Sequence, residues 1–231
     1  LEFKHPKDIT DKTELEKFKD IKTAEAKTEN KEIKELPPVP FDLTSMQIEA
    51  YKLFGISPKE TLALAQDLYT QGLISYPRTS SQKLPAAIQY VDVIKELQKQ
   101  KQYSSLCKNI LNGKLKPNEG PKTDPAHPAI YATGEIPKKL TERQQKIYDL
   151  VVKRFLATFS TPAKRQTMTI ITEVNKEKFV SRGTLTLEPG WHVIYEPYVK
   201  LKEVELPDVK QGDEVKVKKI SLLEKETQPP K

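Results

Sequence analysis

The sequence predicts an α+β fold in which a helical domain is inserted into a β-rich domain. Apolar residues recur at helical spacing in several segments between about residues 41 and 162. Residues 166–174 and 178–188 instead alternate between apolar and polar side chains and are rich in Thr, Val, Ile and Leu, which is typical of strands. The change of period places strands after the helices and favours two kinds of domain in one chain.

The expected domain boundaries follow from this change of period and from a proline-rich linker. The linker, Pro37-Pro38-Val39-Pro40, is expected to be stiff and extended. Residues 1–36 are predicted to form the first part of the β-rich domain, and residues 163–231 the second part. Residues 37–162 between them are predicted to form the helical domain.

The N-terminal part is dense in charge of both signs. Residues 1–36 contain nine Lys and ten Asp or Glu, with few apolar residues between them. We expect much of this segment to be solvated or mobile, with a short strand at residues 1–3. Leu1 at the start and Pro229-Pro230-Lys231 at the end suggest a segment of a longer chain.

Local signals predict where the first helices begin and end. Asp42 or Thr44 can cap a helix that runs to about Leu53. Ser57-Pro58 combines an N-cap residue with proline at the first helical position, and Gly72 is placed to end the helix that follows.

The remaining elements have clear but shorter signals. Residues 86–97 repeat at helical spacing, whereas residues 114–137 are rich in Pro and Gly and should be loop. Thr141 and Gln144 form a capping box that opens the clearest helix. In the β-rich part, residues 214–220 alternate like a strand, and Asn175 marks a hairpin turn.

Composition limits the possible partners and compartment. The net charge of +7 is compatible with a nucleic-acid partner, although many basic domains bind none. The single cysteine, Cys107, excludes an intramolecular disulfide and a zinc site of two or more cysteines, and it is expected to be a small semi-buried residue. Cysteine usage predicts a reducing, cytoplasmic location, and no apolar run reaches the length of a membrane span.

The stretch Gly72–Ser81 contains the main candidate for chemistry. Pro77 disfavours helix at Tyr76 and favours an extended conformation, in which Tyr76 and Arg78 point to the same side. A phenol nucleophile beside a guanidinium with paired donors suits attack on a phosphodiester. The hydroxyls of Thr79, Ser80 and Ser81 can contact phosphate or cap the next helix, and the residues alone also allow a tyrosine at an ordinary helix-to-loop corner.

Three ordered elements make the sequence resemble the type IA DNA topoisomerases. The first is Gly72-Leu73-Ile74 followed by Tyr76-Pro77-Arg78-Thr79. The second is Ala126-His127-Pro128-Ala129-Ile130, and the third is the segment from Leu140 to Ala163 with Arg154-Phe155. The resemblance covers residues 41–163 firmly and the rest of the chain more weakly, and residues 41–69 match the lead-in helices.

This resemblance implies a mechanism and residue roles. Tyr76 would attack a single DNA strand to form a transient 5′-phosphotyrosyl bond, which allows strand passage and relaxation of negative supercoils without ATP. Arg78 would orient the scissile phosphate, and His127 would position the nucleophile or the phosphate. DNA contacts are expected from Thr79, Ser80, Ser81 and Arg154.

The resemblance also implies a missing part. In the family, a Toprim domain supplies a glutamate and an Asp-x-Asp cluster for Mg²⁺, and no Asp-x-Asp occurs in this chain. The chain would be the gate-and-arch portion, with the Toprim domain of the same enzyme and single-stranded DNA as partners, and it would be inactive alone. Ser80 stands where bacterial members often have Asp, and Pro128 where some have an acidic residue. The pattern of Pro77 and Ser80 resembles archaeal topoisomerase I or topoisomerase III more closely.

Three other interpretations were weighed. A non-catalytic nucleic-acid-binding module would use the lysine-rich residues 95–122, with Tyr103 for stacking. A tyrosine recombinase would need its tyrosine after the histidine, whereas Tyr76 precedes His127. The topoisomerase part of a reverse gyrase would share the motifs found here.

Overall fold

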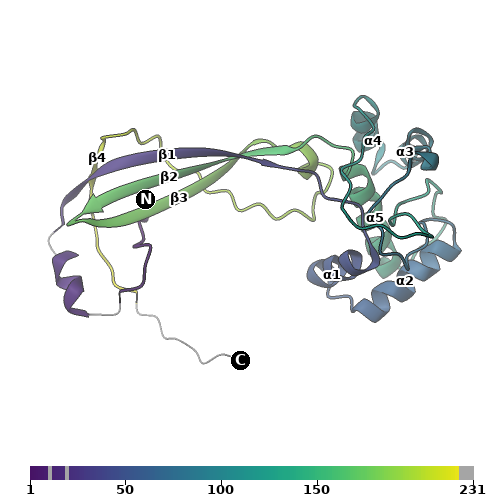
Figure 1. Cartoon of the computed structure of the whole chain (residues 1–231), viewed down its shortest axis with the longest axis horizontal. Helices are drawn as coiled ribbons and strands as arrows, with labels where there is room; N and C mark the ends of the chain where they lie inside the picture. Colours follow the sequence, from purple (N-terminus) through teal and green to yellow (C-terminus); the bar gives the residue numbers. More distant parts are fainter. Residues whose placement is uncertain (10–11, 19–20, 224–231) are drawn as a thin grey trace. The chain divides into compact units, whose positions relative to one another are not determined.

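The computed structural model describes residues 1–9, 12–18 and 21–223, and it confirms the α+β fold (Figure 1). The chain forms two compact units. The β unit contains Leu1–Ile33, Arg165–Thr186 and the described residues from Lys202 onward. The helical unit contains Lys34–Lys164 and Leu187–Leu201. Residues 187–201 thus group with the helices, although they lie beyond the boundary predicted at residue 162.

The helical unit is built from short helices around a central longer one. In chain order they are α1 (Leu43–Phe54), α2 (Pro58–Thr70), η2 (Ala86–Ile88), α3 (Tyr90–Gln98), α4 (Ser104–Leu111), α5 (Glu142–Ala157) and η3 (Gly190–His192). One side of α5 is fully buried, and this helix packs against α1, α2 and α4. The residues between α4 and α5 are loop, as predicted, with isolated bridges at Ile130 and Ala132.

Local chemistry explains where these helices begin. The Asp42 carboxylate accepts the Ser45 N–H at 2.7 Å and caps α1. Ser57 caps α2 with Pro58 at the first helical position, and Thr141 caps α5 in the predicted capping box with Gln144. The starts at Ser57 and Thr141 confirm the predictions from sequence, and of the two caps considered for α1 the structure has Asp42 and not Thr44.

Two helical predictions needed correction. Residues 86–97 do not form one helix, because Gln89 has a positive φ of 56° and separates η2 from α3. Helix α4 was not predicted. It is one of the shorter helices, and its N-cap residue Tyr103 makes no side-chain cap hydrogen bond, so no start signal marked it.

The β unit contains a four-stranded antiparallel sheet in the order β3-β2-β1-β4. The strands are β1 (Thr23–Glu35), β2 (Ala163–Val174), β3 (Glu177–Glu188) and β4 (Glu214–Lys216). β1 pairs antiparallel with β4, with Ala24 opposite Val215. β2 and β3 form the predicted hairpin through Asn175 and Lys176, whose φ angles of 51° and 67° suit a two-residue turn. The strand predicted at residues 214–220 is limited to the three residues of β4.

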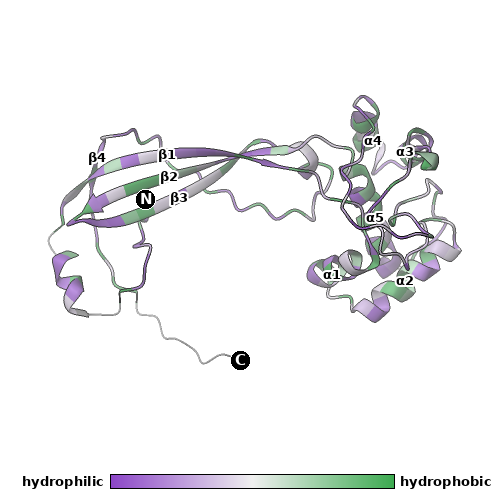
Figure 2. Ribbon diagram, in the orientation of Figure 1, coloured by the Kyte–Doolittle hydropathy of each residue, from purple (hydrophilic) through white to green (hydrophobic). Residues whose placement is uncertain are grey.

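Strand β1 is the largest departure from the sequence predictions. The charged N-terminal segment was expected to be solvated or mobile, but much of it is a long hydrophilic strand (Figure 2). Only Ala24 and Ala26 in it are buried, and alanine gives a weak strand signal. Hydrogen bonds to β2 on one side and β4 on the other form the strand. The strand expected at residues 1–3 is a single bridge between Lys4 and Val180.

The helix preceding β1 is a short 3-10 helix, η1 (Lys12–Phe18), inside the same unit. Its Phe18 packs edge-on against Phe179 of β3, with ring centroids 5.3 Å apart. Among the described residues, no helix is long and apolar enough to span a membrane.

Candidate active site

The segment after α2 is held in place by backbone pairing with the loop before α5. Gly72 has a positive φ of 75°, which turns the chain after the helix. Ile74 then forms an isolated antiparallel bridge with Ala132. The Ser75 N–H donates to the Tyr131 carbonyl at 2.9 Å, and the Ser75 hydroxyl donates to the Ala129 carbonyl at 3.1 Å. These bonds bring the segments around Tyr76 and His127 side by side.

Tyr76 lies half-buried between two aromatic rings. Its phenol ring is 4.6 Å from the imidazole of His127 and 5.3 Å from the phenol of Tyr69, measured between centroids. Tyr76 is outside any helix and precedes the buried Pro77, as the sequence predicted. The structure therefore joins two of the three predicted catalytic residues, Tyr76 and His127.

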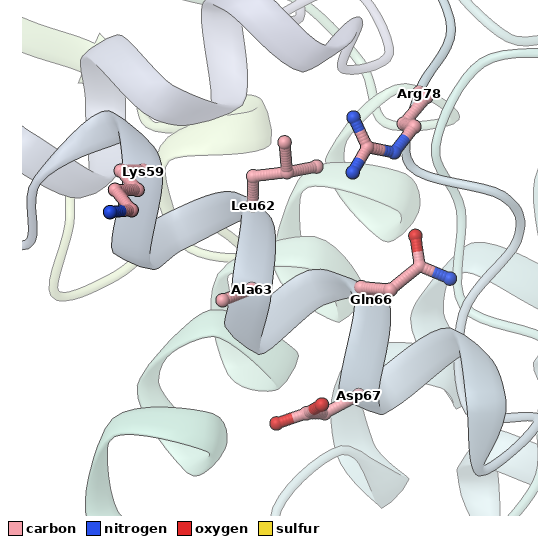
Figure 3. A pocket seen from close by; sticks show the side chains of 6 residues that line it. All are labelled: Lys59, Leu62, Ala63, Gln66, Asp67 and Arg78. Atoms are coloured by element: carbon pink, nitrogen blue, oxygen red, sulfur yellow. The ribbon is translucent and has the colours of Figure 1, made fainter.

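Arg78 is exposed and lies against the outer face of α2. It lines a shallow hollow of about 390 Å³, shown in Figure 3; the other lining residues are Lys59, Leu62, Ala63, Gln66 and Asp67. The spacing of Leu62, Gln66 and Tyr69 places these three residues on one face of α2. Tyr76, beside Tyr69, and Arg78, beside Leu62 and Gln66, therefore contact the same face of that helix.

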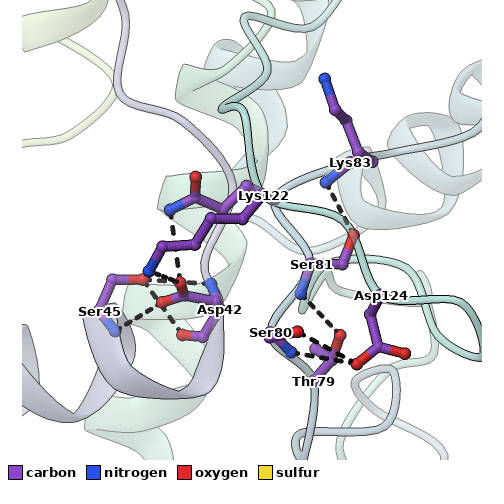
Figure 4. Close-up of polar contacts among 9 residues, drawn as sticks. Asp42, Ser45, Thr79, Ser80, Ser81, Lys83, Lys122 and Asp124 are labelled. Carbon is purple, nitrogen blue, oxygen red and sulfur yellow. Dashed lines mark hydrogen bonds and ion pairs between the residues drawn. The ribbon is translucent and has the colours of Figure 1, made fainter.

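Two carboxylates join the neighbouring loops, as Figure 4 shows. Asp42, the cap of α1, accepts from Lys122 Nζ at 2.7 Å and from Gln82 Nε2 at 3.4 Å. Asp124 accepts from the backbone N–H of His127 at 3.1 Å and from the Ser80 hydroxyl at 3.3 Å. The two carboxylates thus help to join the segment after Arg78 to the loop that carries His127.

These hydrogen bonds lower the pKa of both carboxylates. Burial raises the pKa of Asp42, but the hydrogen bonds from Lys122 and Ser45 outweigh burial and leave this pKa below its ordinary value. The backbone N–H groups of Ala126 and His127, with smaller contributions from Ser80, hold the pKa of Asp124 below its ordinary value. Both groups are therefore ionised at neutral pH.

The three predicted DNA-contacting hydroxyls differ in exposure. The Thr79 side chain is buried, where its hydroxyl donates to the His127 carbonyl at 3.4 Å and accepts the Ser81 N–H at 3.0 Å. The hydroxyl of the buried Ser81 accepts the Lys83 N–H at 3.1 Å. Of the three residues, only Ser80 is exposed. The hydroxyls of Thr79 and Ser81 are therefore engaged by neighbouring backbone groups, and the predicted DNA contacts of these residues stay predictions.

Arg154, the other predicted DNA contact, is engaged by side chains of the helical unit. Its guanidinium lies over the rings of Phe41 and Tyr195, with distances of 4.0 and 4.9 Å to their centroids. It also forms an ion pair with Glu49, and its side chain is only 12% exposed. The guanidinium is thus engaged by two rings and one carboxylate inside the helical unit, and its buried Nε has no hydrogen-bond partner among the described residues.

Two further residues are buried in the helical core. Tyr103, considered for stacking on nucleotides, is completely buried, and its hydroxyl donates to Asp149 at 2.8 Å. It cannot stack on a nucleotide in this fold. Cys107 is likewise completely buried, and burial raises the pKa of its thiol to about 12. The expectation that Cys107 is a packing residue is confirmed.

Sequence reasoning missed the contributions of Tyr69, Lys122 and Asp124. Tyr69 was noted only as part of a helical pattern, and the exposed Lys122 only as part of a basic run. Asp124 did have a usable signal. An aspartate before proline that bonds backbone N–H groups two and three residues later is typical of an Asx turn.

The expected metal ion has no fitting ligand set in the part of the chain that the structure describes. Within residues 1–9, 12–18 and 21–223, no three His, Cys, Asp or Glu side chains gather in an arrangement that could hold a metal ion. The carboxylates of Asp42 and Asp124 already accept hydrogen bonds from N–H, O–H or ammonium donors of the protein. This environment suits a carboxylate held by hydrogen bonds and not one that coordinates a cation. These residues therefore do not fit Mg²⁺.

Comparison with known proteins agrees with the fold and the motifs. The sequence model of the DNA topoisomerase family matches residues 2–231, which is nearly the whole chain. The chain belongs to the type IA DNA topoisomerases.

Its relatives include archaeal enzymes. DNA topoisomerase 1 of Methanocaldococcus jannaschii is 47% identical over 225 residues, which covers 95% of this chain and 29% of the relative. DNA topoisomerase 1 of Methanothermobacter thermautotrophicus is 46% identical over 194 residues, covering 84% of this chain and 27% of the relative. Human DNA topoisomerase 3-alpha is 31% identical over 195 residues, which covers 84% of this chain and 19% of the relative. The chain thus spans less than a third of the length of these relatives.

A solved structure supports the fold. Full-length topoisomerase I from Thermotoga maritima superposes with a TM-score of 0.66 over 93% of this chain and 36% of the bacterial chain. At 22% sequence identity, this similarity concerns the fold alone.

Proposed function

We propose that this chain supplies the nucleophile of a DNA-relaxing enzyme, and that the nucleophile is Tyr76. The observation that carries the proposal is the contact between the Tyr76 phenol and the His127 imidazole, beside an exposed Arg78 on the same face of α2. A phenol that can act as nucleophile, an imidazole in ring contact with it and a guanidinium are side chains that phosphoryl transfer can use.

The chemistry is an exchange of one phosphate ester for another. The Tyr76 phenol loses its proton to solvent or to a neighbouring base as its oxygen attacks the phosphorus of a single-stranded DNA. A bond from phosphorus to the tyrosine oxygen forms, and the bond to the 3′ oxygen breaks. The protein then holds the 5′ phosphate, and the other end leaves as a 3′ hydroxyl after it takes up a proton. Because the two esters are similar in energy, the reverse attack reseals the strand without ATP.

The neighbouring side chains have separate roles in this proposal. Arg78 directs paired N–H donors at the non-bridging phosphate oxygens, where negative charge increases during attack. His127, whose imidazole contacts the Tyr76 ring, orients the phenol or the scissile phosphate. Ser80 is the exposed one of the three predicted hydroxyl contacts; its hydroxyl donates to Asp124, so a contact with the DNA backbone would require the O–H to turn from Asp124 to a phosphate oxygen.

The intact protein is proposed to relax negative supercoils in the cytoplasm by passing DNA through the cleaved strand. Mg²⁺ would be bound by acidic residues of a Toprim domain, because the described residues of this chain offer no ligand set. The partners are therefore single-stranded DNA and the Toprim domain of the same protein.

The test uses the intact protein and a single-stranded oligonucleotide labelled at either end. A 5′-phosphotyrosyl bond predicts that the 3′-labelled fragment becomes attached to protein while the 5′-labelled fragment is released. Tyr76→Phe should abolish attachment and leave non-covalent binding nearly unchanged, because only the attacking oxygen is lost. Tyr51→Phe is the matched control, since Tyr51 is an exposed tyrosine on α1. Attachment that persists in Tyr76→Phe would exclude Tyr76, and attachment of the 5′-labelled fragment would indicate the opposite polarity.

A further inference from the structure

Asp124 lies in the loop before His127, and its two oxygens bind two different segments. Oδ1 accepts the backbone N–H groups of Ala126 at 2.9 Å and His127 at 3.1 Å. Oδ2 accepts from Ser80, at 3.4 Å from the backbone nitrogen and 3.3 Å from the hydroxyl. One carboxylate therefore shapes the turn that leads into His127 and also attaches this turn to the segment that follows Arg78 (Figure 4).

The backbone of His127 is held on both sides of its Cα. Its N–H donates to Asp124, and its carbonyl accepts from the Thr79 hydroxyl at 3.4 Å. Within the described part of the chain, no hydrogen bond holds the imidazole itself, and its ring contact is with Tyr76. The backbone bonds therefore fix the Cα from which the imidazole reaches the phenol, and the Tyr76 ring supplies the side-chain contact.

The rest of the loop favours a single conformation. Pro125 follows Asp124 and Pro128 follows His127, so the φ angles of both prolines are restricted, as are the conformations of the residues before them. The Ala129 N–H donates to the Lys83 carbonyl at 2.9 Å, which attaches the end of the loop to the same neighbouring segment. At the start of the loop, Asp124 adds its attachment to the backbone bond from the Gln82 N–H to the Lys122 carbonyl at 2.9 Å.

We propose that Asp124 is a positioning residue of this site, which keeps the His127 imidazole against the Tyr76 phenol and couples it to the segment of Arg78 through Ser80. This inference rests on the proposed roles of Tyr76 and His127. In this proposal Asp124 acts through the backbone of His127 and through Ser80, and takes no direct part in the reaction.

Substitutions of Asp124 and Ser80 separate the two attachments that the Asp124 carboxylate makes. Asp124→Ala removes both attachments. Asp124→Asn keeps one acceptor oxygen for the turn but presents an NH₂ donor to the Ser80 N–H, so one attachment is weakened. Ser80→Ala removes the hydroxyl alone and leaves the turn around His127 intact.

The experiment measures single-turnover cleavage of a single-stranded oligonucleotide, and its non-covalent binding, in the intact protein. Asp124→Ala should slow cleavage on the order of tenfold to a hundredfold with binding changed less than about twofold, because a displaced catalytic group mainly affects the chemical step. Asp124→Asn and Ser80→Ala should lie between Asp124→Ala and the wild type. Asp92→Ala, at an exposed aspartate in the first turn of α3, is the control and should cleave normally.

The decisive measurement is a double-mutant cycle with His127→Ala. If Asp124 acts through His127, Asp124→Ala should cost little further cleavage rate once the imidazole is absent. Fully additive losses, or wild-type cleavage by Asp124→Ala, would overturn the inference while leaving the role of His127 in place. Wild-type cleavage by His127→Ala would instead overturn the role of His127, and this inference with it. If Asp124→Ala does not fold, the same cycle with Ser80→Ala and Asp124→Asn gives the answer.

Discussion

The imidazole of His127 lies 4.6 Å from the phenol ring of Tyr76, although the two residues belong to separate loops. The contact is possible because Ile74 pairs with Ala132. This antiparallel bridge places the segment that leads to Tyr76 beside the segment that follows His127. A short backbone pairing thus brings together two side chains from different sequence motifs, and Arg78 lies beside them on the face of α2.

Replacing Arg78 by lysine should slow DNA cleavage on the order of tenfold or more, because lysine keeps the charge but lacks the planar pair of donors. The measurement is the single-turnover rate in the intact protein. Arg143→Lys is a suitable control, because Arg143 is an exposed arginine of α5 that pairs with Glu60. Relaxation at the wild-type rate by Arg78→Lys would show that Arg78 is structural.

The 231-residue chain by itself should not relax negatively supercoiled plasmid in the presence of Mg²⁺. Attack by the phenol and departure of the 3′ oxygen both need charge stabilisation, and the described residues offer no cluster that could hold a metal ion. Addition of a separately expressed Toprim half should restore relaxation. Relaxation by the chain alone that is lost in Tyr76→Phe would contradict this prediction.

The chain alone should still bind single-stranded DNA weakly. Its net charge of +7 favours phosphate contacts. Such contacts release counterions from the DNA, and because this release is less favourable at higher salt concentration, the affinity falls as salt is added. We expect the affinity measured by fluorescence anisotropy to fall steeply between low and physiological salt. A salt-independent affinity would indicate another kind of contact.

Replacing Asp42 by alanine should lower the free energy of unfolding by about 1–2 kcal/mol at neutral pH, because α1 loses its N-cap. The folded-state pKa of Asp42 is below its ordinary value of 3.8, so the ionised cap stabilises the fold above that pH and the contribution is lost as pH falls through the lowered pKa. The difference between Asp42→Ala and wild type should therefore shrink in denaturation experiments at pH below about 4. Asp42→Asn keeps a capping side chain and should lower the free energy of unfolding less than Asp42→Ala does. If both substitutions lower it equally, the effect is due to the ion pair between Asp42 and Lys122.

Cys107 should resist thiol reagents in the folded protein and react completely in denaturant. Its side chain is completely buried, and burial raises the thiol pKa to about 12, so the reactive thiolate is disfavoured even at pH 9. Mass spectrometry after treatment with iodoacetamide measures the labelled fraction. Rapid labelling of the folded protein at pH 8 would show that the helical core opens around α4.

Signals carried by neighbouring residues were sufficient for part of this protein. The caps at Asp42, Ser57 and Thr141 and the turn at Asn175 were predicted because each depends on backbone groups within a few positions in the chain. The Tyr76-Pro77-Arg78 segment was predicted to leave the helix for the same reason, since proline restricts the residue before it.

The tertiary structure alone decided the features that depend on distant partners. β1 forms from a charged segment because β2 and β4 supply hydrogen bonds on both sides. Arg154 is occupied by Phe41, Tyr195 and Glu49, which are far from it in sequence. The sequence by itself determined which side chains could carry the chemistry, through local backbone preferences and motifs. Packing and backbone pairing between distant segments decided that Tyr76 and His127 meet, while Thr79 and Arg154 are used inside the fold.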